Sequence, residues 1–211
     1  IQKRSERKGK RTNMMVVGLT GPTGAGKSVV CRLLGDWERI SIIDCDQVAR
    51  QVVRRGEHCL LDLAVEVSSA ILDKDGELNR RKLAGIVFSD REKLRKMEKI
   101  IYPYILAHIL QQIHRREVAG DRAVFLDAPT LYQSGANILC QRVVAVLAPE
   151  AGRLLRIMER DGLTIEEAKA RISSQPGDAY YEKRADHIIR NIGDTSALRL
   201  AVLELQNKLG L

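Results

Sequence analysis

The chain has 211 residues, of which 45% are hydrophobic and only 4% aromatic. This content suffices for one ordinary domain with an aliphatic core, and it excludes general disorder. No apolar run is long enough to span a membrane, and the four cysteines lie far apart with no CxxC pair, so we expect no membrane attachment, no zinc finger and a reducing, cytoplasmic location.

The formal net charge of +8 is concentrated at the start of the chain. Residues 1–13 hold six basic residues against Glu6, a net +5, which leaves +3 for the rest. We predict that residues 1–13 form a disordered basic extension, with contact to nucleic acid or anionic lipid as the weaker alternative. The small charge of the remaining chain favours an anionic small-molecule substrate, so no nucleic-acid partner is expected.

Short apolar runs alternate with amphipathic stretches along the rest of the chain. Apolar runs rich in β-branched residues predict strands that are buried on both faces, and the intervening stretches predict helices. Strands separated by helices are typical of a doubly wound parallel sheet, here of about five strands. The predicted strands are 14–20, 41–44, 123–127, 142–147 and 187–190, and the clearest helices are 27–37, 91–116, 150–160 and 195–209.

Residues 57–120 carry helical patterns and no strand signal, apart from a turn predicted at Asp73–Gly76. Pro103 is expected to kink the long helix in this segment. We therefore predict a helical insertion over 57–120. It would divide a core made of 14–56 and 121–211.

The strongest motif is Gly21-Pro22-Thr23-Gly24-Ala25-Gly26-Lys27-Ser28, which matches G-x-x-x-x-G-K-[ST] between a predicted strand and a predicted helix. Glycines allow backbone N–H groups to converge on phosphate oxygens at a helix N-terminus. Lys27 would reach the β- and γ-phosphates, and Ser28 would bind Mg²⁺. The motif predicts a nucleotide phosphate loop. The absence of an NKxD motif weakens the GTPase alternative.

Carboxylates follow two predicted strands at the edge where a parallel sheet collects its ligands. If the strand geometry continues through Asp44-Cys45-Asp46, both carboxylates share one side. One would hold Mg²⁺ and the other would accept the proton of an attacking hydroxyl; the alternative is that one only caps a helix near Gln47. Asp127 has the position of a Walker-B carboxylate, with a plain turn as the alternative.

Arginines gather in a predicted lid at about 153–178. Arg153, Arg156 and Arg160 share one helix face. Lid arginines can cover the charge of a transferring phosphoryl group. The alternative is a solvated basic face paired with Glu159, Glu166 and Glu167.

In these features the chain resembles the dephospho-CoA kinases, a family of P-loop small-molecule kinases. The resemblance covers nearly all of residues 14–210. The segments that carry it are GLTGPTGAGKS (18–28), IIDCDQVAR (42–50), LDKDGELNRRKLAGIVFSD (72–90), YPYI (102–105), FLDAPTLYQSG (125–135), RLLRIMERDGLT (153–164), RISSQ (171–175) and ADHIIRNIG (185–193).

This resemblance implies transfer of the ATP γ-phosphoryl to the ribose 3′-hydroxyl of dephospho-CoA, the last step of coenzyme A synthesis. It implies ATP and Mg²⁺ as cofactors, and 57–120 as the acceptor-binding insertion. The residue roles that it implies are catalysis by Lys27, Asp46, Arg156 and Arg160; nucleotide binding by residues 21–28, Val29, Asn191 and Gly193; acceptor binding by Asp46, Arg80, Tyr102 and Asp127; and metal binding by Ser28 and Asp44.

Three positions depart from the family pattern. Tyr102 replaces the usual His before Pro103 and can hydrogen-bond but carries no positive charge; Gln133 replaces a frequent Glu, and Val29 a frequent Thr. The alternatives are a kinase for another small hydroxyl acceptor such as a nucleoside or nucleotide, a P-loop binding protein without turnover, and a nucleic-acid ATPase. We expect a monomer or a weak homo-oligomer.

Overall fold

The computed structural model describes residues 14–211, and the predicted basic extension lies outside the described residues. Five strands form one sheet in the order β2-β3-β1-β4-β5, and all four neighbouring pairs are parallel. This confirms the predicted doubly wound α/β fold. The strands are β1 (Met15–Thr20), β2 (Ile40–Asp44), β3 (Ala123–Asp127), β4 (Arg142–Leu147) and β5 (His187–Arg190).

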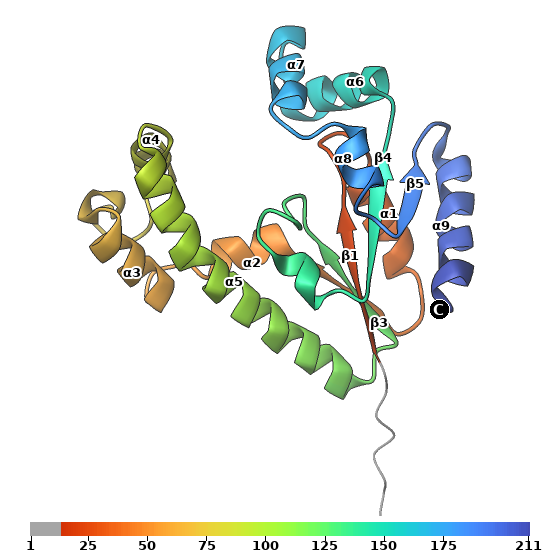
Figure 1. Ribbon diagram of the computed structural model, residues 1–211, viewed down its shortest axis with the longest axis horizontal. Coiled ribbons are helices and arrows are strands. Elements are labelled where there is room, and N and C mark those ends of the chain that lie inside the picture. Colours follow the sequence, from red (N-terminus) through yellow and green to blue (C-terminus); the bar gives the residue numbers. More distant parts are fainter. Residues whose placement is uncertain (1–13) are drawn as a thin grey trace, which may run out of the picture.

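Helices cover both faces of the sheet, and two further groups of helices extend beyond it (Figure 1). Predicted and observed helix ends agree to within three residues for the four clearest helices. The helices are α1 (Lys27–Gly35), α2 (Cys45–Gln51), α3 (His58–Glu66), α4 (Arg80–Phe88), α5 (Arg91–Ala119), α6 (Glu150–Asp161), α7 (Ile165–Ser173), α8 (Asp178–Glu182) and α9 (Thr195–Leu209), with 3-10 turns at Ser69–Ile71 and Ala136–Leu139.

Side chains alternate between the two faces along each strand, so each face has its own core. In β3, Phe125 packs with α1 and α9, whereas Val124 and Leu126 pack with α2 and α5. The central strands are apolar nearly throughout because neither face meets water. The carboxyl ends of these strands point toward α6 and α8 (Figure 1), which is where a parallel sheet gathers its ligands.

The predicted insertion is helical, with one isolated antiparallel bridge between Leu72 and Leu78 beside the predicted turn. Its main element is α5, a single helix that includes Pro103. The Asp90 carboxylate accepts hydrogen bonds from two backbone N–H groups at the start of α5, and Gly120, at φ 85°, ends the helix. Ile105 and Ile109 of α5 belong to the core that also contains the residues on the α2 side of the sheet.

Within residues 14–211, no helix combines the length and the apolar content needed to cross a membrane.

Candidate active site

The phosphate loop lies between β1 and α1 and is packed closely against two other elements. Gly21 has φ 138°, and a Cβ there would lie 2.1 Å from the Val146 carbonyl oxygen in β4. Gly24 has φ 74°, and a Cβ there would lie 2.8 Å from the Arg153 carbonyl oxygen in α6. Both positions require glycine, because a side chain would be strained and would also collide with backbone.

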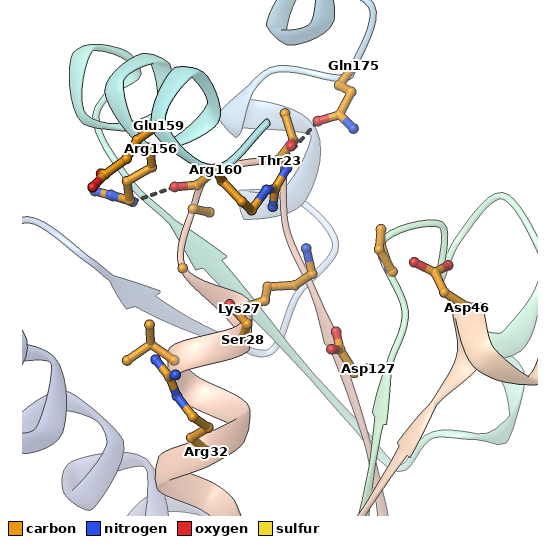
Figure 2. Close-up of a pocket in the computed structure, with 15 residues that line it drawn as sticks. Thr23, Lys27, Ser28, Arg32, Asp46, Asp127, Arg156, Glu159, Arg160 and Gln175 are labelled. Atoms are coloured by element: carbon orange, nitrogen blue, oxygen red, sulfur yellow. Dashed lines mark hydrogen bonds between the residues drawn. The ribbon is translucent and has the colours of Figure 1, made fainter. Parts of the chain in front are cut away.

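A cavity of about 790 Å³ opens beside this loop at the carboxyl end of the sheet (Figure 2). It brings together residues from the loop, α1, α2, β3, α6 and the segment after α7. Its lining consists of Thr23, Gly24, Ala25, Gly26, Lys27, Ser28, Val29, Arg32, Asp46, Asp127, Pro129, Arg156, Glu159, Arg160 and Gln175. Most of the predicted nucleotide and catalytic residues therefore share one cavity.

Lys27 extends from the start of α1 into the open centre of this site (Figure 2). Its Nζ donates a hydrogen bond to the Gly21 carbonyl oxygen at 3.1 Å, which holds the ammonium group over the loop. Burial lowers the pKa of Lys27, and the nearby Asp127 carboxylate opposes that shift. The site thus holds a poorly solvated cation, the kind of group that an incoming phosphate neutralises.

Asp127 ends β3 and lines the same cavity. The Cys31 thiol donates to its Oδ2 at 3.3 Å, while its Oδ1 is buried and has no partner among residues 14–211. Burial raises the pKa of Asp127 even though the Lys27 charge lowers it. This carboxylate therefore has one oxygen without a partner among the described residues, and the Walker-B role of Asp127 stays a prediction.

The two acidic residues after β2 do not alternate as a strand would place them. Helix α2 begins at Cys45, and the Asp44 Oδ1 accepts a hydrogen bond from the Gln47 N–H at 2.9 Å. The expectation of one extended segment is wrong, because an N-cap ends the strand at Asp44. Asp46, in the first turn of α2, lines the cavity. Burial, and then the Asp44 charge, raise the pKa of Asp46.

Helix α6, in the predicted lid, brings its arginines to the phosphate loop. Arg156 donates to the Gly24 carbonyl oxygen, and Arg160 lines the cavity while binding Asp161 through Nε and Nη2 at 2.8 and 2.7 Å. Arg171 of α7 also pairs with Asp161. The alternative of pairing with the three predicted glutamates is wrong. The carboxylate that pairs with Arg160 and Arg171 is Asp161, at the end of α6.

A second cavity, of about 400 Å³, lies between α2, α4 and α5, and Asp46 lines both cavities. Arg50 and Arg80 are its basic residues, and its other lining residues are apolar: Ala49, Val53, Leu78, Leu83, Ala84, Val87, Phe88, Met97 and Ile101. Tyr102 lines neither cavity. Its hydroxyl donates to Glu98 Oε1, on its own helix, at 3.4 Å.

Of the remaining residues predicted to bind the nucleotide, some line the cavity and some do not. Val29 lines it, whereas Gly21, Pro22 and Gly193 do not. Asn191 follows β5, and its Nδ2 donates to the Ala25 carbonyl oxygen at 3.0 Å. Asn191 therefore supports the phosphate loop from outside.

Sequence reasoning gave no role in the site to Gln175, Arg32 and Glu159, although Glu159 was considered as a partner of the arginines; all three line the site. Gln175 accepts a hydrogen bond from the Thr23 N–H at 2.7 Å (Figure 2). The segment RISSQ already pointed to this region. Glu159 and Arg32 had no signal beyond their helical spacing from Arg156 and Ser28.

Comparisons with known proteins agree with this geometry. The family model described as Dephospho-CoA kinase matches residues 15–197. The dephospho-CoA kinase of Listeria innocua is 39% identical over 175 residues, which cover 83% of this chain and 87% of the relative. The enzyme of Geobacillus kaustophilus is 35% identical over 191 residues, or 90% of this chain and 94% of the relative.

Solved structures give the same result. The dephospho-CoA kinase from Campylobacter jejuni superposes with a TM-score of 0.69 at 27% identity, covering 92% of this chain and 96% of that one. The structure of TT1252 from Thermus thermophilus superposes with a TM-score of 0.78 at 31% identity, covering 93% and 98%. A shikimate kinase from Acinetobacter baumannii, at 18% identity and a TM-score of 0.52, shares the fold. The chain belongs to the dephospho-CoA kinase family.

Proposed function

We propose that this protein is an ATP-dependent kinase that phosphorylates the ribose 3′-hydroxyl of dephospho-CoA, giving coenzyme A and ADP. The observation that carries the proposal is the position of Asp46. Its side chain lines both the phosphate cavity and the second cavity between α2, α4 and α5. A carboxylate at this junction can contact an acceptor hydroxyl while the phosphoryl donor occupies the phosphate loop.

In this mechanism the loop and Lys27 bind the ATP phosphates. The acceptor oxygen attacks the γ-phosphorus, its proton passes to the Asp46 carboxylate, and the bond to the β,γ-bridging oxygen breaks to release ADP. Lys27, Arg156 and Arg160 stabilise the charge that spreads over the transferring group. The raised pKa of Asp46 suits a base that must also release the proton again.

Oxygen donors for Mg²⁺ are present beside the loop. Ser28, Asp46 and Asp127 line the cavity, and Asp127 Oδ1 is buried without a partner among the described residues. Residues 14–211 contain no cluster of three His, Cys, Asp or Glu side chains that could hold a metal ion. This fits Mg²⁺, which is commonly bound by one or two carboxylates together with substrate phosphates. When bound, Mg²⁺ neutralises phosphate charge. Ser28 and Asp127 would hold it, and Asp44, which caps α2, would contribute from the outer shell.

The second cavity has the composition that the acceptor requires. Arg50 and Arg80 can bind the diphosphate of dephospho-CoA, and the apolar wall that includes Val87, Met97 and Ile101 can cover its pantetheine arm. Tyr102 faces Glu98 instead, so we assign the recognition of phosphate in this cavity to the two arginines. The proposal therefore has the acceptor bound between α2 and the insertion, and the nucleotide bound at the phosphate loop.

The expected setting of the enzyme follows from the same features. All four cysteines are free thiols, as in a reducing cytoplasm. The substrates are small anions, so no nucleic acid or membrane partner is proposed, and a monomer or weak homo-oligomer suffices for the reaction.

An acceptor panel tests the proposal. ADP release is measured with dephospho-CoA and, in parallel, with adenosine, nucleoside monophosphates and pantetheine. We expect turnover with dephospho-CoA only, and a product phosphorylated at the 3′ position. Faster turnover with a nucleoside or nucleotide would assign the enzyme to another acceptor, and nucleotide binding without acceptor-dependent ADP release would make it a binding protein.

Lys27→Ala tests the donor side. We expect loss of turnover with an unchanged circular dichroism spectrum, because the ammonium group touches the loop but belongs to neither core. A folded variant with near-normal kcat would contradict the proposed role of Lys27 and its loop in phosphoryl transfer.

A further inference from the structure

Thr23 of the phosphate loop is hydrogen-bonded to both ends of the predicted lid. At the start of α6, Arg153 donates its Nε–H to the Thr23 carbonyl oxygen at 3.0 Å. After α7, Gln175 accepts from the Thr23 N–H at 2.7 Å. One residue of the loop is therefore bonded through both of its backbone groups to segments that lie more than 120 residues away.

Arg153 is buried to an unusual degree for an arginine, with 5% of its surface exposed. Its Nη1 lies 3.6 Å from Asp178 Oδ1, at the start of α8, which is an ion-pair distance but too long for a hydrogen bond. Within the described chain, the Thr23 carbonyl is the one hydrogen-bond acceptor found for this guanidinium group. Burying a charge is costly unless it is hydrogen-bonded and paired; the Thr23 carbonyl supplies the hydrogen bond and Asp178 the opposite charge.

The next two carbonyls of the loop are held in the same way. The Gly24 carbonyl accepts from Arg156 and the Ala25 carbonyl from Asn191. The loop presses against α6 at this point, since a Cβ on Gly24 would lie 2.8 Å from the Arg153 carbonyl oxygen. Three successive carbonyl oxygens of the loop thus have side-chain donors of their own. A phosphate group needs N–H donors from the loop and is repelled by carbonyl oxygens, so these bonds favour a loop conformation in which the carbonyls do not meet the phosphate.

We propose that Arg153 is a positioning residue for the nucleotide: by holding the Thr23 carbonyl, it keeps the phosphate loop in its binding conformation and fixes the base of the lid to that loop. Arg153 is absent from the cavity lining, so it acts through the loop and does not touch the nucleotide. Arg156 and Arg160 are different, because both reach the cavity. The inference rests on the proposed function only in that ATP binds at this loop.

The test is ATP binding measured by calorimetry without acceptor, so that it needs no turnover. Arg153→Leu removes every donor, and we expect the Kd for ATP to rise about tenfold or more. Arg153→Gln keeps an N–H that can reach the Thr23 carbonyl, and we expect its Kd to stay within about threefold of the parent. Arg184→Leu is the matched control, because Arg184 is exposed and stacks on Tyr180; its Kd should not change.

Two further measurements separate positioning from a general structural role. In ligand-free Arg153→Leu, hydrogen exchange of the Thr23 amide should quicken while exchange in β1 and β3 stays at the parent rate. The KM for dephospho-CoA should change less than about twofold, since the second cavity is remote from α6.

Several results would overturn the inference: a folded Arg153→Leu that binds ATP normally, or losses of nucleotide and acceptor affinity that run in parallel. If Arg153→Leu does not fold, Arg153→Gln and Asp178→Asn decide the question. Both should bind ATP within about threefold of the parent, because both keep the bond to Thr23. A tenfold loss in either contradicts the inference. A parent protein that does not bind ATP at all would instead refute the proposed function.

Discussion

The two helical regions beside the site are attached to the sheet in different ways. The insertion shares one continuous core with the sheet: Ile105 and Ile109 of α5 belong to the same buried cluster as Val124 and Leu126 of β3. The α6–α7 lid has a small core of its own, made of Ile157, Ala168 and Ile172. The links that we find between lid and phosphate loop are polar, from Arg153, Arg156 and Gln175.

This difference predicts which region moves. Withdrawing the lid breaks a few hydrogen bonds and exposes little apolar surface, whereas withdrawing α5 opens the main core. We therefore predict that the proposed acceptor cavity belongs to the side that stays fixed and that the phosphate cavity is covered by the side that moves. Asp46, on α2, would belong to the fixed side, and Arg156 and Arg160, on α6, to the moving side; all three line the phosphate cavity.

The largest effect is expected at Asp46, the residue of the fixed side that we propose as the base for the acceptor hydroxyl. Asp46→Asn keeps the size and the polarity of the side chain but cannot accept a proton. We expect kcat to fall at least about a hundredfold, within the range of general-base catalysis, with a much smaller change in the Kd for ATP. Steady-state kinetics and calorimetry check this. Turnover within a few-fold of the parent would remove Asp46 as the base.

Two matched core substitutions test the comparison itself, because Ile109 of α5 and Ile157 of α6 are both fully buried. Ile109→Ala should lower the free energy of unfolding of the whole protein by about 2–5 kcal/mol. Ile157→Ala should quicken hydrogen exchange in residues 150–173 and lower kcat, with exchange in β1 and β3 unchanged. Urea unfolding and hydrogen exchange measure both variants. Equal global destabilisation would show that the lid is not a separate unit.

Ligand binding should reveal the same division in the parent protein. We expect hydrogen exchange in residues 153–178 to slow when ATP and dephospho-CoA bind together, because Arg156 and Arg160 then hold phosphate. Exchange in α5, which is already packed on the sheet, should change little. Either ligand alone serves as the control. The same exchange rates in the lid with and without both ligands would contradict a closing lid.

Much of this arrangement could be predicted from the sequence. The strands could be predicted because a strand that is buried on both faces needs a nearly continuous run of apolar residues. The strands β3, β4 and β5 have the predicted bounds. The phosphate loop was identified by its glycines, and these are required where Gly21 and Gly24 meet backbone of β4 and α6. Local patterns succeeded where a local physical cause decides the structure.

The two errors have different causes, a local helix cap in one case and contacts with distant residues in the other. Alternation predicted one side for Asp44 and Asp46, but the Asp44 cap starts α2 at Cys45. Spacing put Arg153 on a common face with Arg156 and Arg160, yet only the fold shows that it is buried. Its partners Thr23 and Asp178 come from other elements. A sequence pattern carries no information on such contacts.

The smallest predicted effect concerns Asp44. It distinguishes the role of Asp44 as the N-cap of α2 from the effect of its negative charge on Asp46. Asn is as good an N-cap as Asp, so Asp44→Asn should keep the hydrogen bond from the Gln47 N–H and the start of α2. What disappears is the negative charge that, after burial, raises the pKa of Asp46. The pKa of Asp46 should therefore fall in this variant.

The base acts when it is deprotonated, so a lower pKa keeps it active in more acidic solution. The acid limb of the kcat profile should shift to lower pH in Asp44→Asn, with kcat near neutral pH little changed. Asp90→Asn is the matched control: it makes the same substitution at the N-cap of α5, at a residue that lines neither cavity, and should leave the limb in place. If Asp44 binds the metal instead, the Mg²⁺ concentration needed for half-maximal rate should rise while the acid limb stays put. A limb that moves to higher pH would contradict the assignment of Asp46 as the base whose charge is opposed by Asp44.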